Sequence, residues 1–402
     1  MNDDSKTPPL KGLRVIDAST VIAGPTIGML MGDFGADVIK VEHPRGDVLR
    51  VTGAQKDGIG LWFKMANRNK RCVTLNFGSE KGQELFKEMI KSTDVLIENF
   101  RTGTMEKWGI GWEDLKAINP RLVMIRVTGF GQTGPYKNRP GFGTIAEAFS
   151  GFAAITGDPD GPPTLPNFGL ADGIAAAYGT FAAMFALYHR DAQGAGVGQY
   201  IDLSIYEPLF QVLGPQPLQY DQLGTVQQRW GNRSKNNAPR NTYQTKDGHW
   251  VAISTNAPAI VKRVLTLCGG PEAAEDPRFQ TPQSRVEHIE EVDGIVAGWI
   301  AERDLKTVLD EFERVEAAIG PAYSIDQIFE DAQFLARNDI VEIEDEELGK
   351  IRMTGAFPVM SETPASIRHA GPRKGQHNDE IYIEEMGLSP GQLAALKDEG
   401  VI

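Results

Sequence analysis

A carboxylate in apolar surroundings is the clearest candidate for chemistry in this 402-residue chain. Asp172 lies within Phe168–Gly173, beside Leu170, Ala171 and Ile174, at the predicted start of an Ala-rich helix. An acid at that place can cap the helix, which stabilises it by about 1 kcal/mol. It can also be a nucleophile in a dry pocket, held ionised by the amides of the helix N-terminus. The residues alone leave both interpretations open.

Polar and aromatic side chains follow three predicted strands. They are His43 and Arg45 after one strand, Asn99 and Phe100 after another, and Lys137 and Arg139 in a glycine-rich loop after a third. Carboxyl ends of parallel strands face the ligand crevice in a doubly wound sheet. Together these groups predict a site for a nucleotide and a pantetheine chain, although each loop alone is equally well read as a surface turn.

Two further segments suggest a phosphate-bearing ligand. The loop Ala18–Pro25 can present backbone N–H groups to a phosphate, or can be a plain tight turn. It is not GxGxxG, which disfavours a nicotinamide- or flavin-dependent dehydrogenase. Asn67–Arg71 holds three cations and two amides directly before a strand, which favours an anionic ligand, with an exposed turn as the alternative.

Composition narrows the function classes. The net charge of −13 argues against nucleic acid or an anionic membrane as partner. Two cysteines, Cys72 and Cys268, suit a reducing cytoplasm and make no disulfide framework or thiolate metal site. The six histidines are scattered, so no metal site is expected, although carboxylate-only Mg²⁺ binding stays open. Residues 1–11 are polar and lack a signal-peptide core, and Gly173–Leu187 is too short for a membrane span, which predicts a buried helix.

The elements that must position these groups alternate along the first 200 residues. Strands are expected at 13–17, 37–42, 72–76, 94–99, 122–128 and 200–205, with helices at 26–34, from 79 onward and at 169–190. This order predicts a doubly wound, mostly parallel sheet. After a loop at 215–241, a hairpin around Lys246–Gly248 and helices at 256–268, 284–301 and 304–316 predict a smaller α+β domain. Two strands at 339–353 and two short helices, 379–386 and 389–397, close the chain.

The chain resembles the class III CoA-transferases, the family that includes formyl-CoA transferase, carnitine CoA-transferase and α-methylacyl-CoA racemase. The resemblance rests on motifs in the family's order along nearly the whole chain. They are LKGLRVID at 10–17, AGP at 23–25, GADVIKVEHP at 35–44, NKR at 69–71, DVLIENF at 94–100, ADG at 171–173, KDG at 246–248, DPRF at 276–279, IGP at 319–321 and DEGVI at 398–402.

The resemblance implies a fold and an assembly. The fold is α/β, with a doubly wound Rossmann-like large domain and a smaller α+β domain forming an open ring that interlocks with a second copy in a homodimer. The large CoA-binding domain would comprise 1–205 and 335–402, the linker 206–240, the small domain 241–320 and the return linker 321–334. The enzyme would be cytoplasmic.

The resemblance also implies a reaction. Asp172 would be the nucleophile that forms an aspartyl-acyl anhydride and then an aspartyl-CoA thioester. CoA would move from an acyl-CoA donor, such as succinyl-CoA or a similar thioester, to a small carboxylic acid, without metal, nucleic acid or membrane. The implied CoA contacts are Ile22, Ala23, His43, Arg45, Leu75, Asn99, Phe100, Lys107, Lys137 and Arg139.

Two departures from the family bear on function. Many members carry Tyr followed by Asp or Glu where this chain has Phe142 and Gly143, and the racemase branch carries His-Asp. The missing base argues against an acyl-CoA racemase or epimerase, which remains an alternative together with a non-catalytic CoA-binding protein. Glu147 can replace the missing acid or can be a solvated helix carboxylate.

The second departure replaces the family's glycine loop with the basic segment Gly231–Asn237. There Arg233 and Lys235 can meet the distal carboxylate of a dicarboxylic acyl group, or can belong to a solvated loop.

Overall fold

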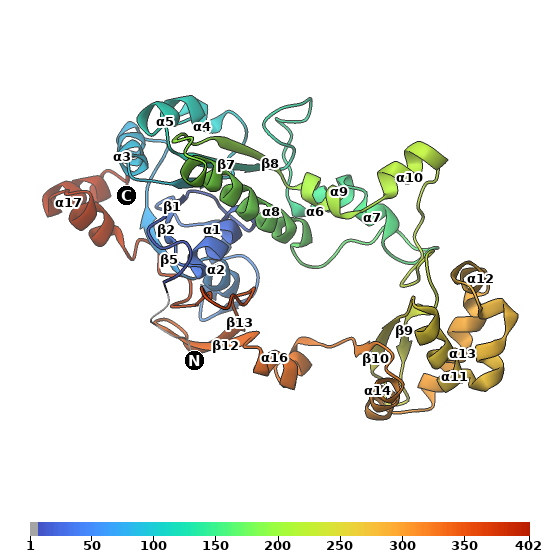
Figure 1. The fold of residues 1–402 in the computed structure, drawn as a ribbon. Helices are drawn as coiled ribbons and strands as arrows, with labels where there is room; N and C mark the ends of the chain where they lie inside the picture. The colour runs from blue at the N-terminus through green and yellow to red at the C-terminus, as the bar shows by residue number, and fades with distance from the viewer. Residues whose placement is uncertain (1–6) are drawn as a thin grey trace. The chain divides into compact units, whose positions relative to one another are not determined.

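The computed structural model describes residues 7–402; residues 1–6, part of the polar N-terminal segment, lie outside the described residues. The chain divides into two compact units (Figure 1). The larger unit contains the chain up to residue 152 together with 165–224 and 336–402, and the smaller unit contains 153–164 and 225–335. These bounds differ from the expected domains in two ways. Residues 206–224 of the expected linker belong to the larger unit. Residues 153–164, the rest of that linker and the expected return linker 321–334 belong to the smaller unit.

Six parallel strands form the sheet of the larger unit, in the order β5-β2-β1-β6-β7-β8. They are β1 Arg14–Asp17, β2 Asp37–Glu42, β5 Lys70–Thr74, β6 Val95–Glu98, β7 Val123–Thr128 and β8 Tyr200–Ser204. The chain order reverses between β1 and β6, and this switch point is where ligands bind in such sheets. The predicted α/β class with a parallel central sheet is therefore confirmed.

Alternate residues of each strand face opposite sides of the sheet, and helices cover both sides. Val15 and Ile97 face α1 (Ala23–Asp33) and α8 (Leu170–Leu187), which lie together on one side in Figure 1. Ile16 and Leu96 face the other side, where α3 (Glu80–Ile90) and α5 (Trp112–Ile118) pack. Every one of these strand residues is fully buried, so the sheet is positioned by packing on both faces.

Helix α8 is buried on one face only, where a wholly buried helix was expected. Its small residues pack closely on α1, since a Cβ at Gly179 would lie 2.5 Å from the Cδ1 atom of Ile27. The other face exposes Phe181, Phe185 and Tyr188. By length and composition alone, the stretch Leu170–Ala192 could cross a membrane, with 39% of its most apolar window buried.

The rest of the larger unit consists of shorter elements. They are α2 Leu61–Ala66, α4 Thr104–Lys107, α6 Gly143–Phe149, α7 Phe152–Ile155 at the border of the two units, α9 Tyr206–Val212, α10 Gln216–Leu223, the hairpins β3 Gln55–Lys56 with β4 Ile59–Gly60 and β12 Ile340–Asp345 with β13 Gly349–Thr354, the π-helical turn Glu380–Glu385, and α17 Pro390–Asp398. The expectation of a loop over 215–241 is wrong at its start, where α10 forms. This helix has Pro217 in its first turn, is followed by Gly224 and exposes most of its side chains.

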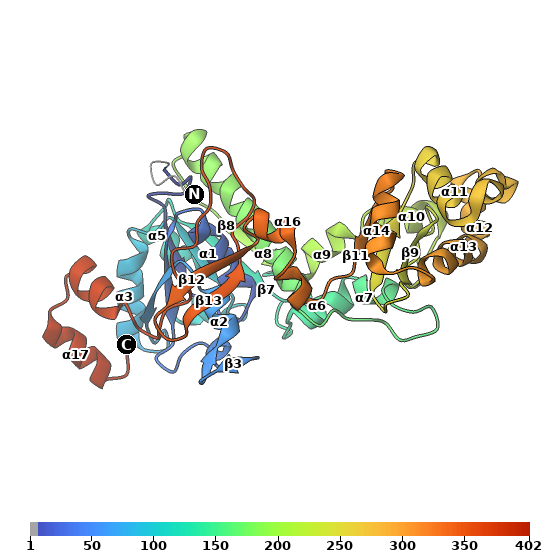
Figure 2. The same ribbon diagram turned by 90° about the horizontal axis from the view of Figure 1, so that it is seen from below.

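The C-terminal segment covers the outer edge of the sheet. The N–H of His377 donates to the carbonyl of Cys72 (2.9 Å), and Asn378 accepts from the N–H of Thr74 (3.0 Å). The hydroxyl of Tyr382 donates to the carbonyl of Thr74 (2.8 Å). Lys64 of α2 pairs with Asp345 of the β12–β13 hairpin (2.8 Å), which lies beside α2 in Figure 2.

The smaller unit is the predicted α+β arrangement. Its antiparallel sheet has the order β11-β10-β9, with β9 Arg240–Gln244, β10 Trp250–Ser254 and β11 Ile319–Pro321. Its helices are α11 Pro258–Glu275, α12 Pro282–Glu287, α13 Ile289–Ala301, α14 Leu305–Arg314 and α15 Ile325–Ile328, followed at the border by α16 Ala332–Ala336. The single helix expected at 284–301 is wrong, because His288 leaves the helical conformation and separates α12 from α13.

Candidate active site

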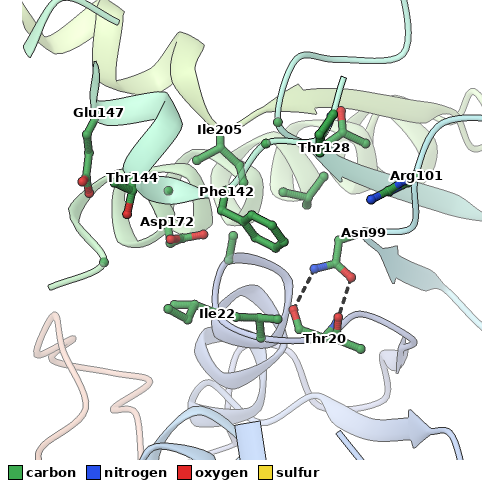
Figure 3. A pocket seen from close by; sticks show the side chains of 18 of the residues that line it. Thr20, Ile22, Asn99, Arg101, Thr128, Phe142, Thr144, Glu147, Asp172 and Ile205 are labelled. Atoms are coloured by element: carbon green, nitrogen blue, oxygen red, sulfur yellow. Dashed lines mark hydrogen bonds between the residues drawn. The ribbon is translucent and has the colours of Figure 1, made fainter. Parts of the chain in front are cut away.

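A pocket of about 530 Å³ opens at the carboxyl ends of β1, β6 and β7. Its lining comes from the loops that follow these strands and from the first turns of α6 and α8, so it lies wholly within the larger unit. Side chains separated by about 150 residues meet here, among them Ile22, Asn99, Glu147 and Asp172 (Figure 3). This is the switch point at which the sequence predicts a ligand.

Asp172 is the third residue of α8 and does not cap it. Gly169 is the N-cap residue, and the Asp172 carboxylate makes no hydrogen bond or ion pair to any residue in the 7–402 range that the structure describes. The interpretation of Asp172 as a helix cap is therefore wrong. The carboxylate points into the pocket (Figure 3).

The environment of Asp172 disfavours its charge. Burial, and to a smaller extent the nearby charge of Glu147, raise the pKa of Asp172 from its ordinary value to about 6. The expectation that helix amides hold this carboxylate ionised is wrong, because none of them donates to it. At pH 7 and above the carboxylate is still mostly ionised, and it is poorly solvated, as a reactive nucleophile must be.

Glu147 provides the cap that Asp172 does not. It lies in α6, only 2% of it is exposed, and its Oε1 atom accepts the N–H of Ala171 in the first turn of α8 (3.2 Å). The alternative of a solvated helix carboxylate is therefore wrong. Glu147 connects α6 to the turn that carries Asp172.

The backbone of Gly143 lies directly against the carboxylate of Asp172. A Cβ atom at Gly143 would lie 2.1 Å from Oδ2 of Asp172. Any side chain there would displace the nucleophile in its present orientation. The carboxylate that α6 brings near Asp172 is that of Glu147, one helical turn after Gly143.

The loop between β1 and α1, residues 18–22, forms the side of the pocket opposite α6. Asn99 holds it with two hydrogen bonds: its Oδ1 atom accepts the N–H of Thr20 (2.8 Å), and its Nδ2 atom donates to the carbonyl of Thr20 (2.7 Å) (Figure 3). Val21 has a φ of 68°, in the left-handed region that a β-branched residue rarely adopts. The loop is thus held in a conformation that its own residues do not favour.

The predicted CoA contacts divide into two groups. Ile22, Ala23, Asn99, Phe100, Lys137 and Arg139 line the pocket, whereas His43, Arg45, Leu75 and Lys107 do not. Leu75 is fully buried in the core, and as a CoA contact it remains a prediction. Lys107 is an exposed residue at the end of α4.

His43 and Arg45 contact each other outside the pocket. The Nδ1 atom of His43 accepts the backbone N–H of Arg45 (3.0 Å). Partial burial and then the Arg45 charge lower the pKa of His43, so its ring is neutral near pH 7. As CoA contacts, both remain predictions.

The cationic segment Asn67–Arg71 is structural. Arg68 pairs with Asp33 (2.6 Å) and Lys70 with Asp17 (2.8 Å), and both cations are almost completely buried. Arg71 pairs with Asp37 (2.6 Å). Among the described residues these cations already have acidic partners, so the interpretation of this segment as a phosphate site is wrong.

Arg233 and Lys235 belong to the smaller unit. Arg233 pairs with Asp293 (2.8 Å) and donates to Glu290, and Lys235 lies 5.1 Å from the ring centre of Trp230. Their role as substrate contacts remains a prediction.

Arg101, Trp62 and Phe168 are among the pocket residues that lie outside the predicted site residues. Arg101 directly follows Asn99 and Phe100, so the strand-end pattern already contained its signal. Trp62 comes from α2, a helix that the sequence pattern does not predict. Phe168 enters from the loop before α8.

Comparisons with known proteins identify the family of the chain. Residues 10–378 match the CoA-transferase family III. The succinyl-CoA–D-citramalate CoA-transferase of Chloroflexus aurantiacus is 41% identical over 98% of both chains. The succinate–glutarate CoA-transferase of Agrobacterium fabrum is 34% identical over 94% of this chain and 96% of that protein.

Solved structures agree as well. The crystal structure of a CAIB/BAIF family protein from Brucella suis aligns with a TM-score of 0.83, at 32% identity, over 94% of this chain and 99% of that chain. A protein from Mycobacterium tuberculosis aligns with a TM-score of 0.82 at 26% identity, over 93% of this chain and 99% of that chain. From the full-length family match and these identities we conclude that the chain belongs to family III of the CoA-transferases and is an enzyme of that family.

Proposed function

We propose that this CoA-transferase moves CoA from succinyl-CoA to a small dicarboxylic acid, with Asp172 as the covalent nucleophile. The observation that carries the proposal is the Asp172 carboxylate, which lies in the pocket without a partner among residues 7–402. A buried acid without a cation or donor is costly for folding, and such groups concentrate at functional sites.

The relatives support the choice of donor and acceptor. The names of three of them contain succinyl-CoA with D-citramalate, succinyl-CoA with L-malate, and succinate with glutarate. These acids share a carboxylate that becomes the thioester and a second carboxylate at the other end. Arg101 and Lys137 line the pocket as exposed cations and suit an anionic group of the bound substrate.

The reaction proceeds in four balanced steps. The Asp172 carboxylate attacks the thioester carbonyl, forming an aspartyl-succinyl anhydride and releasing CoA thiolate. The thiolate attacks the aspartyl carbonyl, giving an aspartyl-CoA thioester and free succinate. The acceptor carboxylate attacks this thioester and forms a new anhydride, again releasing the thiolate. The thiolate then attacks the acceptor's acyl carbonyl, which gives the new acyl-CoA and frees Asp172.

Glu147 assists Asp172 in this proposal. Its charge contributes to the raised pKa of Asp172 and its hydrogen bond fixes the turn that carries the nucleophile. Racemisation is disfavoured, because Phe142 and Gly143 supply no group that can take a proton from an α-carbon.

The assembly in this proposal is a homodimer of interlocked rings. Exposed apolar side chains gather on three consecutive helices of the larger unit, α8 to α10, and support a large interface with a second copy. They include Phe181, Phe185, Tyr188, Phe210, Leu218, Tyr220 and Leu223. Large exposed apolar patches commonly mark protein interfaces.

The test is chemical trapping of the nucleophile. The enzyme is incubated with succinyl-CoA, quenched with hydroxylamine, digested and mapped by mass spectrometry. A hydroxamate on the Asp172 peptide is expected, and Asp172→Asn should remove it. Acetyl-CoA serves as the comparison donor. A hydroxamate on another residue, or none despite measurable transfer, would contradict the role of Asp172.

A further inference from the structure

Four buried charges lie beside the catalytic pocket and take no part in the proposed reaction. They are Asp17, Lys40, Asp47 and Lys70, here called the Asp17 cluster, and each is at most 4% exposed. Lys70 pairs with Asp17 (2.8 Å), and Lys40 pairs with Asp47 (3.0 Å) and lies 3.9 Å from Asp17. Two cations and two anions balance each other, so the cluster needs no ligand charge.

The cluster holds the backbone on both sides of the strained Val21. The Oδ1 atom of Asp17 accepts the N–H of Ser19 (3.0 Å) and its hydroxyl. Lys40 donates to the carbonyl of Ser19. Lys70 donates to the carbonyl of Pro25 (2.7 Å), in the first turn of α1.

These hydrogen bonds surround a segment that would otherwise relax. Val21 keeps its φ of 68° only while the residues before and after it are fixed. Gly24 allows the tight path, since a Cβ there would lie 2.3 Å from the Oγ atom of Ser19. Ile22 follows Val21 and approaches the start of α8, where a Cβ at Gly169 would lie 3.4 Å from its Cδ1 atom.

We propose that Lys40 and Lys70 are positioning residues for acyl transfer: through Ser19 and Pro25 they fix the backbone of Val21–Ala23, which faces Asp172 across the pocket. The inference rests on the proposed function of that pocket. A shift of about 1 Å in groups that orient a substrate can lower the rate roughly 100-fold. Loss of the hydrogen bonds that fix this loop should therefore lower kcat.

The first test is Lys70→Met, assayed by transfer from succinyl-CoA at saturating substrates. We expect kcat to fall roughly 10- to 100-fold. The KM for succinyl-CoA should change less, because Asn99, Phe100 and Lys137 remain in place. Rates are normalised to the folded fraction.

A second substitution distinguishes positioning from general stability. Glycine adopts a positive φ without steric cost, so adding Val21→Gly to Lys70→Met should restore part of the lost kcat. Arg190→Met is the matched control. Arg190 is 2% exposed and pairs with Asp94 (2.9 Å), which directly precedes β6 at the amino ends of the strands, away from the pocket. It should lower the melting temperature and leave kcat unchanged.

If Lys70→Met does not fold, Ser19→Ala replaces it, since this change removes only the hydroxyl that Asp17 accepts. Its kcat should fall a few-fold and recover when Val21→Gly is added. A wild-type kcat in the foldable variant, or a loss of kcat that Val21→Gly does not relieve, would overturn the inference. Hydroxylamine trapping separates the two failures, because a wrong nucleophile moves the adduct away from Asp172 without changing these kinetic ratios.

Discussion

Asp17 and Asp172 both lie at the carboxyl ends of the strands of one sheet, Asp17 fully buried and Asp172 partly buried, and their surroundings are opposite. Asp17 is completely buried and has two lysines and a serine within reach. Burial alone would raise its pKa, but the charges of Lys40 and Lys70 outweigh burial and hold the pKa of Asp17 below its ordinary value. Asp172 has no cation, and its pKa is raised to about 6 by burial and by Glu147.

The difference in surroundings corresponds to a difference in role: Asp17 stabilises the structure, whereas Asp172 is the proposed nucleophile. A buried carboxylate with cations and donors gives rigidity, because moving it would expose every partner as an unpaired charge. A carboxylate left unpaired lowers stability and keeps its electron pair available for attack on a thioester. Four changes test this contrast, from the largest expected effect to the smallest.

The first change removes the nucleophile. Asp172→Ala should lower kcat for transfer by roughly 10⁴-fold or more, because the carboxylate that forms the anhydride is lost. Binding of CoA, measured by calorimetry, should stay within a few-fold, since the lost side chain is not a CoA contact. Retained turnover would show that Asp172 is only structural.

The second change breaks the supporting aspartate. Asp17→Asn leaves Lys40 and Lys70 facing each other with one anion fewer, and should lower the free energy of unfolding by about 3–5 kcal/mol. Chemical denaturation at pH 7.5 measures this value. An unchanged stability would mean that the cluster relaxes easily and that Asp17 and Asp172 differ less than their surroundings suggest.

The third change should have the opposite sign. The raised pKa of Asp172 means that its contribution to stability is complete below its ordinary value of 3.8 and is lost as the pH rises through about 6. Asp172→Asn should therefore stabilise the fold at pH 7.5, by up to about 3 kcal/mol, and by only about half as much at pH 5. Melting temperatures at the two pH values give the comparison. Equal effects at both would contradict the burial of an uncompensated charge.

The smallest effect concerns the second carboxylate. Glu147→Gln keeps an oxygen that accepts the N–H of Ala171 and removes the charge that raises the pKa of Asp172. The acidic limb of the rate profile, expected near pH 6, should move to lower pH. Glu113→Gln, at an exposed position of α5, is the control and should leave the profile unchanged. An unshifted acidic limb in Glu147→Gln would show that the charge of Glu147 does not influence the pKa of Asp172.

The strand pattern predicted the sheet well because its strands are continuous apolar runs buried on both faces. The sequence also predicted that Asn99, Phe100 and Lys137 lie at the same edge of the sheet, since parallel strands end together, and all three line the pocket. It could not show which charged groups meet. In the sequence, Arg68 and Lys70 suggest a site for an anionic ligand. Their acidic partners, Asp33 and Asp17, lie far from them in the sequence and become visible only in the structure. The role of Glu147 was equally hidden, because it depends on how α6 crosses the start of α8.

The outer strand of the sheet has a consequence for biosynthesis. The segment that pairs with Cys72 and Thr74 contains His377, 305 residues further along the chain. At ribosomal rates of 5–20 residues per second, roughly 15–60 s pass before the ribosome makes the covering segment. During that time the smaller unit is synthesised while the edge of β5 stays bare, and bare strand edges pair with other chains. The edge of β5 in the nascent chain is therefore open to pairing with other chains until the segment around His377 has emerged.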